Sequence, residues 1–146
     1  AGCDSDAGSA ETKVTWPKEA QVSVGQGVVF TTGEVVTSAS YLNVDLIVYK
    51  HGSNNFDLKP GGSSPSDTMY MNPFKKGGVP EIFSSFDDVP STLPTAANYG
   101  DYLGTVKTGN GLVVANNIGD GFTRVWVKQV IASAERVVVL YQPVTP

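Results

Sequence analysis

Short apolar or alternating segments, separated by turn residues, recur along the whole chain and constrain its fold more than any other feature. The clearest three follow one another at residues 111–116, 122–131 and 136–142. Helix-type periodicity is nearly absent, and many short strands with turn signals between them are typical of a sandwich or barrel. The sequence therefore predicts an all-β fold, an antiparallel β-sandwich or flattened barrel with a C-terminal three-stranded meander.

Earlier segments complete the sheet prediction and bring the expected total to seven to nine strands. The additional strands are expected at residues 20–24, 27–31, 34–37, 43–50, 55–58 and 81–83. Thr32 and Gly33 are predicted to form a tight hairpin turn between two of them. Residues 85–88 are expected to form one helical turn, because Ser85 is a residue type that caps helices.

Residues 59–80 differ from the rest of the chain. They are rich in glycine and proline and show neither strand nor helix periodicity. Loops of this length are uncommon in compact domains, and they often bind ligands or are disordered. The segment is therefore predicted to be a binding loop or a disordered insertion.

The size and charge of the chain exclude several classes of protein. A chain of 146 residues forms one domain that can bury a core. With one cysteine, no intramolecular disulfide can form, so packing must hold the fold. No run of 18 or more apolar residues is present that would span a membrane as a helix. A net charge of −4 argues against a nucleic-acid partner, because phosphates are bound by clustered Lys and Arg.

Cys3, the only cysteine, lies in a distinctive context. It follows Ala1 and Gly2 and precedes an acidic stretch of small residues at 4–11. Ala-Gly-Cys resembles the end of a bacterial lipobox, in which the signal peptide is cut before a cysteine that becomes acylated. Each buried CH₂ of an acyl chain stabilises membrane attachment by about 0.8 kcal/mol. The resemblance implies a lipid anchor on Cys3 in the bacterial cell envelope, at the periplasmic face or the cell surface. Residues 1–13 would be anchor and flexible spacer, and residues 14–146 a single all-β domain.

Two further segments carry a second resemblance. One is Phe-Thr-Thr-Gly-Glu-Val-Val at residues 30–36, and the other is the meander with its Gly-Asp-Gly turn at 119–121. Together they resemble all-β bacterial lipoproteins of the HmuY haemophore type. This resemblance supports the fold and the compartment, and it transfers no active site.

A haem or metal site would have few ligands. His51 is the only histidine, so Met69 or Met71 would have to supply the second haem ligand; the ordinary role of His51 is a place in a solvated turn. Calcium prefers oxygen ligands, but the residues that offer them also favour turns. These residues are Asn54, Asn55, Asp57, Asp67, Asn116, Asn117 and Asp120. We therefore predict no cofactor.

Catalytic groups are equally sparse. A Ser-His-Asp triad would depend on His51, and no Gly-x-Ser-x-Gly motif is present. A carboxylate pair that hydrolyses glycosides would come from Glu81, Asp87 and Asp88, although the adjacent aspartates also suit a helical-turn cap. We predict that the protein is not an enzyme. The alternatives are a haemophore-like ligand carrier and a small carboxylate-dependent hydrolase.

One strand carries the best candidate for a binding surface. In an extended strand, Phe122, Arg124, Trp126 and Lys128 share one face. Two aromatic rings between two cations can stack on a sugar or peptide and meet an acidic group. Alternatively, Trp126 packs beneath the long loops and the stems of the cations cover it. A free stripe predicts that Trp126→Ala leaves thermal stability nearly unchanged, whereas a loss of several kcal/mol would place Trp126 in the core.

The sequence therefore predicts a lipid-anchored, non-catalytic binding or assembly module. Its membrane contact would be the anchor on Cys3. Its partner would be a carbohydrate, a peptide or a protein, bound through the stripe on residues 122–128 and the loop at residues 59–80.

Overall fold

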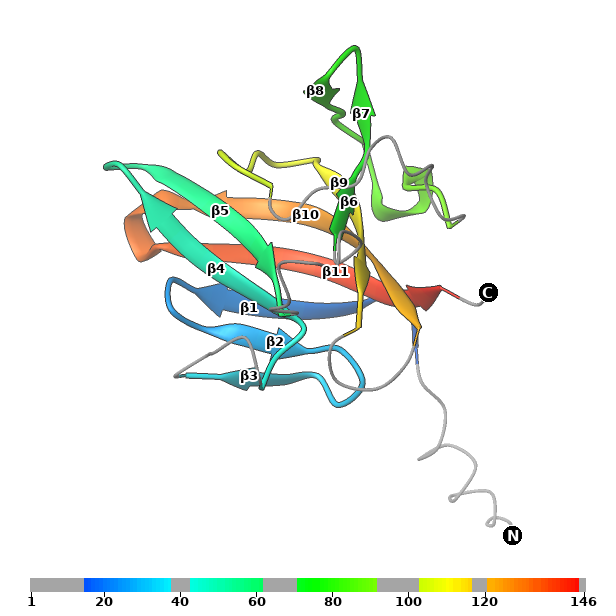
Figure 1. The fold of residues 1–146 in the computed structure, drawn as a ribbon, viewed down its shortest axis with the longest axis horizontal. Coiled ribbons are helices and arrows are strands. Elements are labelled where there is room, and N and C mark those ends of the chain that lie inside the picture. Colours follow the sequence, from blue (N-terminus) through cyan, green and yellow to red (C-terminus); the bar gives the residue numbers. More distant parts are fainter. Residues whose placement is uncertain (1–14, 38–42, 62–70, 92–102, 117–120, 145–146) are drawn as a thin grey trace, which may run out of the picture.

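The structure is a computed structural model that describes residues 15–37, 43–61, 71–91, 103–116 and 121–144. Within these ranges the chain forms an all-β sandwich, which confirms the predicted fold class (Figure 1). The strands of the described residues are arranged in sheets of five, four and two strands. No helix in these ranges is long and apolar enough to cross a membrane.

The five-stranded sheet contains the predicted meander. Its order is β1-β11-β10-β9-β6, and each neighbouring pair is antiparallel. Its strands are β1 Lys18–Ser23, β6 Met71–Pro73, β9 Gly111–Ala115, β10 Phe122–Ile131 and β11 Arg136–Val144. Because β9, β10 and β11 are consecutive and adjacent, the three-stranded meander is confirmed. A 3₁₀ turn at Ala132–Ala134 and a left-handed Glu135, with φ of 51°, connect β10 to β11.

The four-stranded sheet contains the predicted hairpin near residues 27–37. Its order is β3-β2-β4-β5. Its strands are β2 Gly27–Val29, β3 Glu34–Val36, β4 Leu46–His51 and β5 Asn55–Pro60. The hairpin loop is longer than the predicted turn at Thr32 and Gly33, because strand pairing stops at Val29 and Glu34. Gly33 closes this loop with a φ of 78° and donates its N–H to the Val29 carbonyl at 2.7 Å.

The hydrophobic core lies between these two sheets. Along β10, Thr123, Val125 and Val127 are buried, whereas the residues that alternate with them are not fully buried. From the other sheet, Val48 and Leu58 belong to the same buried cluster. Successive side chains of a strand point to opposite faces, so alternate apolar residues of both sheets meet in one layer. The alternation in the sequence is thus the direct cause of the sandwich.

A β-bulge interrupts the alternation of β10. The register against β11 shifts between Val127 and Gln129, which leaves Lys128 as the extra residue. Lys128 and Gln129 are both exposed as a result, and Val130 packs against the core again. The bulge therefore changes which side chains in the second half of β10 point toward the core and which point toward solvent.

The prediction of a loop at residues 59–80 is wrong for residues 59–61 and 71–80, which are the part that the structure describes. β5 extends to Pro60, and β6 pairs with β9 at the edge of the five-stranded sheet. A hairpin follows, formed by β7 Lys75–Lys76 and β8 Val79–Pro80. Its turn, Gly77-Gly78, has φ values of 61° and 79°, as two-residue hairpin turns require. These strands are too short to show periodicity in the sequence.

Tyr141 is a buried ionisable side chain that makes the stability of the fold depend on pH in the alkaline range. Its side chain is 1% exposed and packs against Phe30, with the ring centroids 4.9 Å apart. Burial raises the pKa of the Tyr141 phenol above its ordinary value of 10.0, because a phenolate is poorly solvated in an apolar interior. A raised folded-state pKa stabilises the fold fully below the unfolded-state pKa, and this contribution is lost as the pH rises through the folded-state pKa.

We therefore expect the free energy of unfolding to fall as the pH rises above about 10, and to fall less in Tyr141→Phe. Urea unfolding of both proteins at a series of alkaline pH values measures the difference. The phenylalanine variant has no phenol to ionise and otherwise keeps the ring contacts. Equal pH dependence in the two proteins would contradict a neutral, buried Tyr141.

Candidate functional site

The residues predicted as a binding stripe lie on the outer face of the five-stranded sheet. Phe122, Arg124 and Trp126 alternate along β10 and are partly buried there. Lys128 is displaced from this row by the bulge, and its Nζ donates to Oε1 of Glu19 on β1 at 2.8 Å. That hydrogen bond is the main cause that lowers the pKa of Glu19 below its ordinary value. The structure thus brings three of the four residues together.

A separate segment of the chain covers this row. We name residues 81–89 the strap; it contains the 3₁₀ turn η1 Phe86–Asp88. Phe86 and Val89 of the strap are 4% and 1% exposed, although neither belongs to a sheet. The guanidinium carbon of Arg124 lies 4.2 Å from the centroid of the Phe86 ring. The strap therefore packs on the outer face of the sheet through its own apolar side chains.

Three side chains donate hydrogen bonds to carbonyl oxygens of the strap. The pairs are Trp126 Nε1 to Phe83 at 3.0 Å, Arg124 Nη1 to Val89 at 2.7 Å and Asn110 Nδ2 to Glu81 at 3.1 Å. Arg124 also donates Nη2 to Oε1 of Gln142 at 3.0 Å. A carbonyl that is shielded from water costs free energy if it lacks a donor. The polar groups of the stripe are therefore used to fix the path of the strap.

Backbone contacts hold the first half of the strap. The Phe83 N–H donates to the Gly109 carbonyl at 2.7 Å, and Ile82 forms an isolated bridge with Asn110. The predicted strand at residues 81–83 is thus reduced to this single bridge. A Cβ added at Gly111 would lie 2.8 Å from carbons of the Phe83 ring. Gly111 therefore permits the ring to lie directly on the start of β9.

The sequence pattern did not reveal the roles of Asn110 and Gly111. The available signal was the turn-forming run Gly109-Asn110-Gly111 directly before a predicted strand. Such a run is ordinarily explained by a turn alone. Only the long-range contacts with Phe83 and Glu81 show that these residues also hold a second segment.

The strap supports the β7–β8 hairpin at its base. The Glu81 N–H donates to the Phe74 carbonyl at 2.9 Å, and the rings of Phe74 and Phe83 meet edge to face with centroids 6.0 Å apart. Figure 1 shows the hairpin projecting beyond both large sheets at one end of the molecule. Val79 and Ile82 are 65% and 61% exposed there. They are the most exposed large hydrophobic side chains in the described part of the chain.

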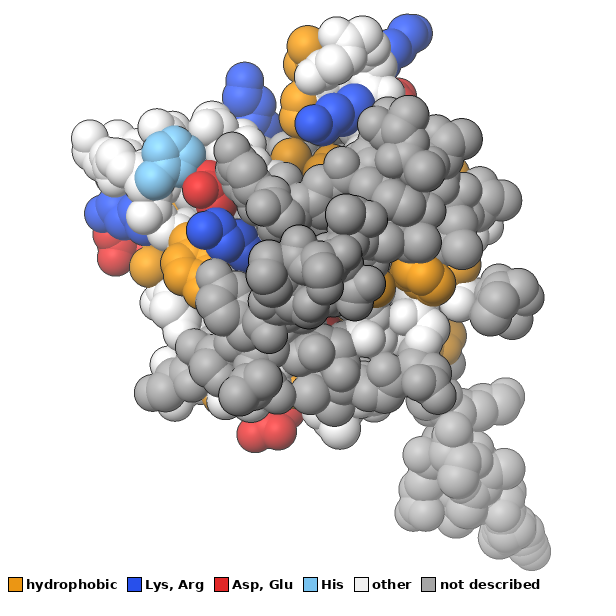
Figure 2. All heavy atoms as spheres, in the orientation of Figure 1, with side chains coloured by type: hydrophobic (Ala, Val, Ile, Leu, Met, Phe, Trp, Pro, Cys, Tyr) orange, Lys and Arg blue, Asp and Glu red, His pale blue; other side chains and the backbone are white. Residues whose placement is uncertain are grey.

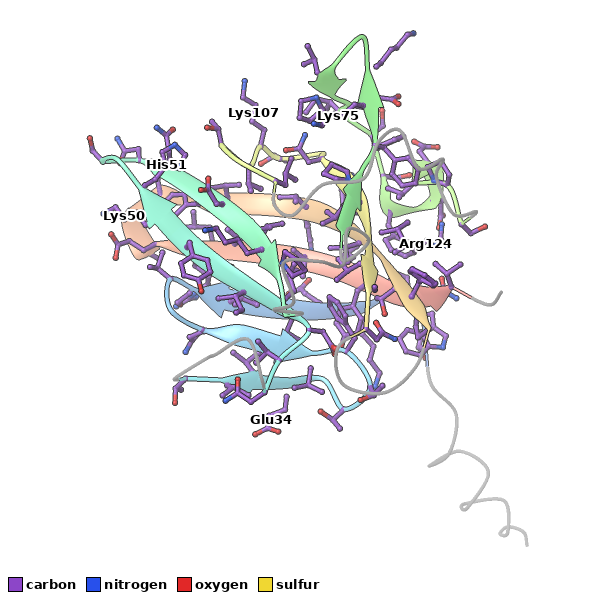
Figure 3. The ribbon with its side chains drawn as sticks, viewed as in Figure 1. Glu34, Lys50, His51, Lys75, Lys107 and Arg124 are labelled. Atoms are coloured by element: carbon purple, nitrogen blue, oxygen red, sulfur yellow. The ribbon has the colours of Figure 1, made fainter. Side chains whose placement is uncertain are left out.

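Lysines accompany these exposed apolar side chains. Lys75 and Lys76 form β7, and Figure 3 shows Lys107 at the same end of the molecule as Lys75. All three are exposed, and none has an ion-pair partner within the described residues. Figure 2 shows lysine and hydrophobic side chains next to one another at this end. We name the surface formed by Lys75, Lys76, Val79, Ile82 and Lys107 the hairpin patch.

Comparison with protein-family models, with curated proteins and with solved structures finds no match for this chain. The lipobox and the resemblance to HmuY-type lipoproteins therefore stay predictions from the sequence.

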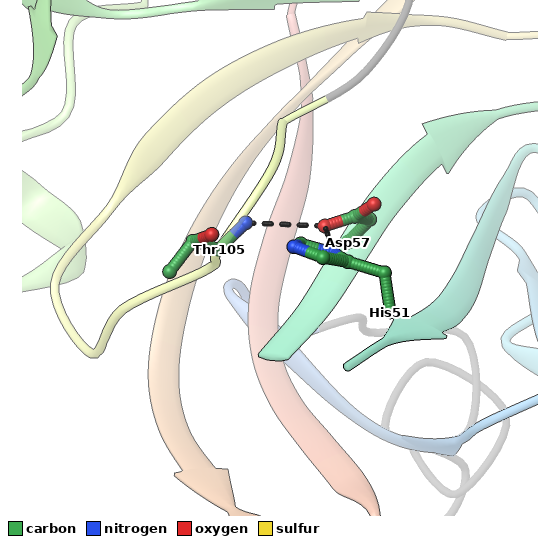
Figure 4. Close-up of polar contacts among 3 residues, drawn as sticks. All are labelled: His51, Asp57 and Thr105. Atoms are coloured by element: carbon green, nitrogen blue, oxygen red, sulfur yellow. Dashed lines mark hydrogen bonds and ion pairs between the residues drawn. The ribbon is translucent and has the colours of Figure 1, made fainter. Parts of the chain in front are cut away.

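His51 lies at the end of β4, in a second candidate site. Its Nδ1 is 2.8 Å from Oδ1 of Asp57 on β5, and the same oxygen accepts the Thr105 N–H at 3.1 Å (Figure 4). The His51 side chain is 50% exposed and that of Asp57 12%. A carboxylate that holds one ring nitrogen orients the other, as in many metal-ligating histidines. Met69 lies outside the described residues, as does the side chain of Met71.

The candidate calcium ligands do not converge where the structure describes them. Asp57 is engaged by His51, and Asn116 Oδ1 accepts a hydrogen bond from Thr123 Oγ1 at 2.7 Å. Within the described residues, no group of three or more His, Cys, Asp or Glu side chains is placed to hold a metal ion. Asn54 lies in the turn before β5 and Asn55 is the first residue of β5. Asp67, Asn117 and Asp120 lie outside the described residues.

The candidate carboxylates for hydrolysis all belong to the strap. Glu81 is partly buried, whereas Asp87 and Asp88 are exposed. Asp88 Oδ2 accepts a hydrogen bond from Ser85 Oγ at 3.3 Å, and residues 86–88 form the expected helical turn as a 3₁₀ turn. The predicted helical turn is thus confirmed, whereas the predicted cap is not, because no side chain forms a capping hydrogen bond at Ser85. Cys3 lies outside the described residues.

Proposed function

We propose that the protein is a non-catalytic binding or assembly module of the bacterial cell envelope, anchored by a lipid on Cys3. The observation that carries the binding role is the hairpin patch, on and beside a projecting hairpin. Its exposed apolar side chains lie beside lysines that have no ion-pair partner within the described residues. Exposed apolar side chains rimmed by polar groups are typical of interaction sites. Trp126 and Arg124 support this surface from below, because they hold the strap. The proposed contact surface is therefore the hairpin that the predicted stripe supports.

The order of strands in the five-stranded sheet separates the proposed anchor from the hairpin patch. β1 and β6 lie at opposite edges of the five-stranded sheet, and neighbouring strands are about 4.8 Å apart. The spacer that follows Cys3 leads into β1, whereas the hairpin follows β6. The spacer would therefore enter the sheet at the edge opposite β6, so the anchor and the hairpin patch would occupy different parts of the domain.

The anchor is tested by the intact mass of the protein, expressed from its full-length gene in a bacterial host. We expect a mass increase of acyl size in the membrane fraction, because the lipobox resemblance implies acylation of Cys3. Cys3→Ser is the matched control and should give unmodified, soluble protein. An unmodified Cys3 in the soluble fraction of the wild type would remove the anchor from the proposal.

The binding role is tested separately on soluble Cys3→Ser protein, with arrays of glycans and short peptides. We expect at least one class of probe to bind, and the binding to be lost in Val79→Ser/Ile82→Ser. Both positions are exposed, so this variant should fold normally. Binding that survives the double substitution would place the site elsewhere.

A second candidate function is a haem carrier, favoured by the hydrogen bond that orients His51 against Asp57. In that case, addition of haem to the protein gives a Soret absorption band that disappears in His51→Ala. Asp57→Asn should weaken binding by about tenfold or more, since partners that orient a ligand have effects of that size. A band that persists without His51 would reveal haem adsorption at another place and contradict this candidate.

A further inference from the structure

We infer that the hairpin patch recognises an acidic segment of a partner protein, one that carries carboxylates beside apolar side chains. This inference rests on the proposed binding role and narrows its partner class. Two properties of the patch support this inference: its lysines have no ion-pair partner in the described part of the chain, and its exposed apolar side chains are aliphatic.

The charge of the patch contrasts with the rest of the protein. The chain carries a net charge of −4, yet the patch brings together three exposed lysines, and the acidic residue that adjoins it in the sequence, Glu81, is partly buried. Other exposed lysines are paired within the chain, Lys50 with Glu135 and Lys128 with Glu19. Complementary charge steers association and rejects wrong partners. A cationic patch without ion-pair partners in the described residues therefore selects an anionic partner, and two copies of the patch repel each other.

The apolar side chains of the patch indicate which class of anionic partner fits best: a protein segment, a glycan or a nucleic acid. The exposed side chains Val79 and Ile82 are aliphatic. The rings beside them, Phe74 and Phe83, are partly buried and pack against each other, whereas a sugar or a base stacks on an exposed ring. Aliphatic side chains next to ammonium groups match a polypeptide that alternates acidic and apolar residues. The patch thus fits a protein segment better than a polyanionic glycan or a nucleic acid.

An anionic lipid surface offers the same combination of charge and apolar groups, but the sheet order argues against it. The hairpin follows β6, at the sheet edge opposite β1. In a protein held to the membrane through Cys3, the chain enters the sheet at the edge opposite β6, which leaves the patch free to meet a protein in the aqueous space. A soluble or surface-exposed protein is the partner that can reach it.

The hairpin also offers a mode of recognition. β7 and β8 pair only with each other within the described residues, so the edges of this small sheet are open to an extended segment. Such a segment gains main-chain hydrogen bonds at a sheet edge, and its alternate side chains give specificity. Pro80 leaves β8 without one N–H donor, which makes β7, with its two lysines, the better edge.

The test uses soluble Cys3→Ser protein and immobilised synthetic peptides in which Glu alternates with Val or Ile, paired with peptides in which every Glu is Gln. We expect the acidic peptides to bind about tenfold or more tightly than the neutral ones, with an affinity that falls as salt is added. Lys75→Glu/Lys76→Glu should lose this binding. Lys18→Glu/Arg136→Glu, which changes the net charge equally on the opposite part of the sheet, should retain it.

Several outcomes would overturn the inference. Equal binding of the Glu and Gln peptides would remove the role of charge, and equal binding by Lys75→Glu/Lys76→Glu would remove the patch. Binding to vesicles that contain phosphatidylglycerol, without binding to any peptide, would identify a lipid surface instead. Binding of glycans alone would contradict the acidic partner but leave the proposed function intact, whereas binding of no probe at all would contradict both.

Discussion

Gly61→Ala is expected to destabilise the protein by about 3 kcal/mol or more, a large effect for the addition of one methyl group. Gly61 follows β5 and passes directly over the residues that precede β4. Its N–H donates to the Asp45 carbonyl at 2.8 Å. A Cβ at this position would lie 1.7 Å from the carbonyl oxygen of Val44 and 2.7 Å from its carbonyl carbon. Because both are backbone atoms, the overlap can be relieved only if the two segments move apart.

Gly25→Ala is the matched control. Gly25 has a φ of 84°, and a Cβ there would have no heavy atom within 4 Å. Its expected cost is the strain of the left-handed conformation alone, about 1–2 kcal/mol. Unfolding of both variants in guanidinium chloride measures the difference. A cost for Gly61→Ala no greater than that for Gly25→Ala would contradict the close approach of the two segments.

Trp126→Ala is expected to destabilise the protein by about 2–4 kcal/mol. The ring is partly buried on the outer face of the sheet, and its Nε1 donates to the Phe83 carbonyl. Truncation therefore removes apolar contacts and leaves that carbonyl without its donor. The structure thus favours a clear loss of stability over the nearly unchanged stability that a free stripe predicts. Trp126→Phe keeps an aromatic ring and should lose only the hydrogen bond, about 1 kcal/mol.

Amide hydrogen exchange locates the effect of Trp126→Ala. The Phe83 N–H, which donates to the Gly109 carbonyl, should exchange faster because the strap opens locally. Amides in the pairing of β10 with β11 should keep most of their protection, since the core between the sheets is intact. Uniform acceleration across the chain would instead show that strap and sandwich unfold as one unit. Unchanged stability would show that Trp126 does not hold the strap.

The sandwich could be predicted because the pattern that produces it, alternation of apolar and polar residues, lies within short segments of the sequence. Alternation along residues 122–127 places every second side chain in the core, and two turns between three long strands allow only a meander. The same logic placed Phe122, Arg124 and Trp126 on one face. It failed at Lys128, because a bulge adds a residue to the spacing without a distinctive residue type.

The candidate site was less predictable because its causes are not local. The donor on Trp126 and its acceptor on Phe83 are 43 residues apart, and no periodicity links them. The strands of the hairpin are two residues long, which is too short for a pattern of period two. Lys-Lys-Gly-Gly was the available signal, since Gly-Gly is typical of a two-residue hairpin turn, but the loop-like composition around it obscured the strands.

The pairing of β1 with β11 has a consequence for the order in which the protein can mature. Lys18 lies opposite Tyr141 and Ser23 opposite Arg136, so the first strand of the sheet finds its neighbour only in the last. Contacts between residues so distant in sequence form slowly, and folds dominated by them take milliseconds to seconds. During synthesis, β1 is therefore expected to wait without a partner until β11 has emerged. Closure of the five-stranded sheet is therefore a late event in folding, because it needs strands from the two ends of the described chain.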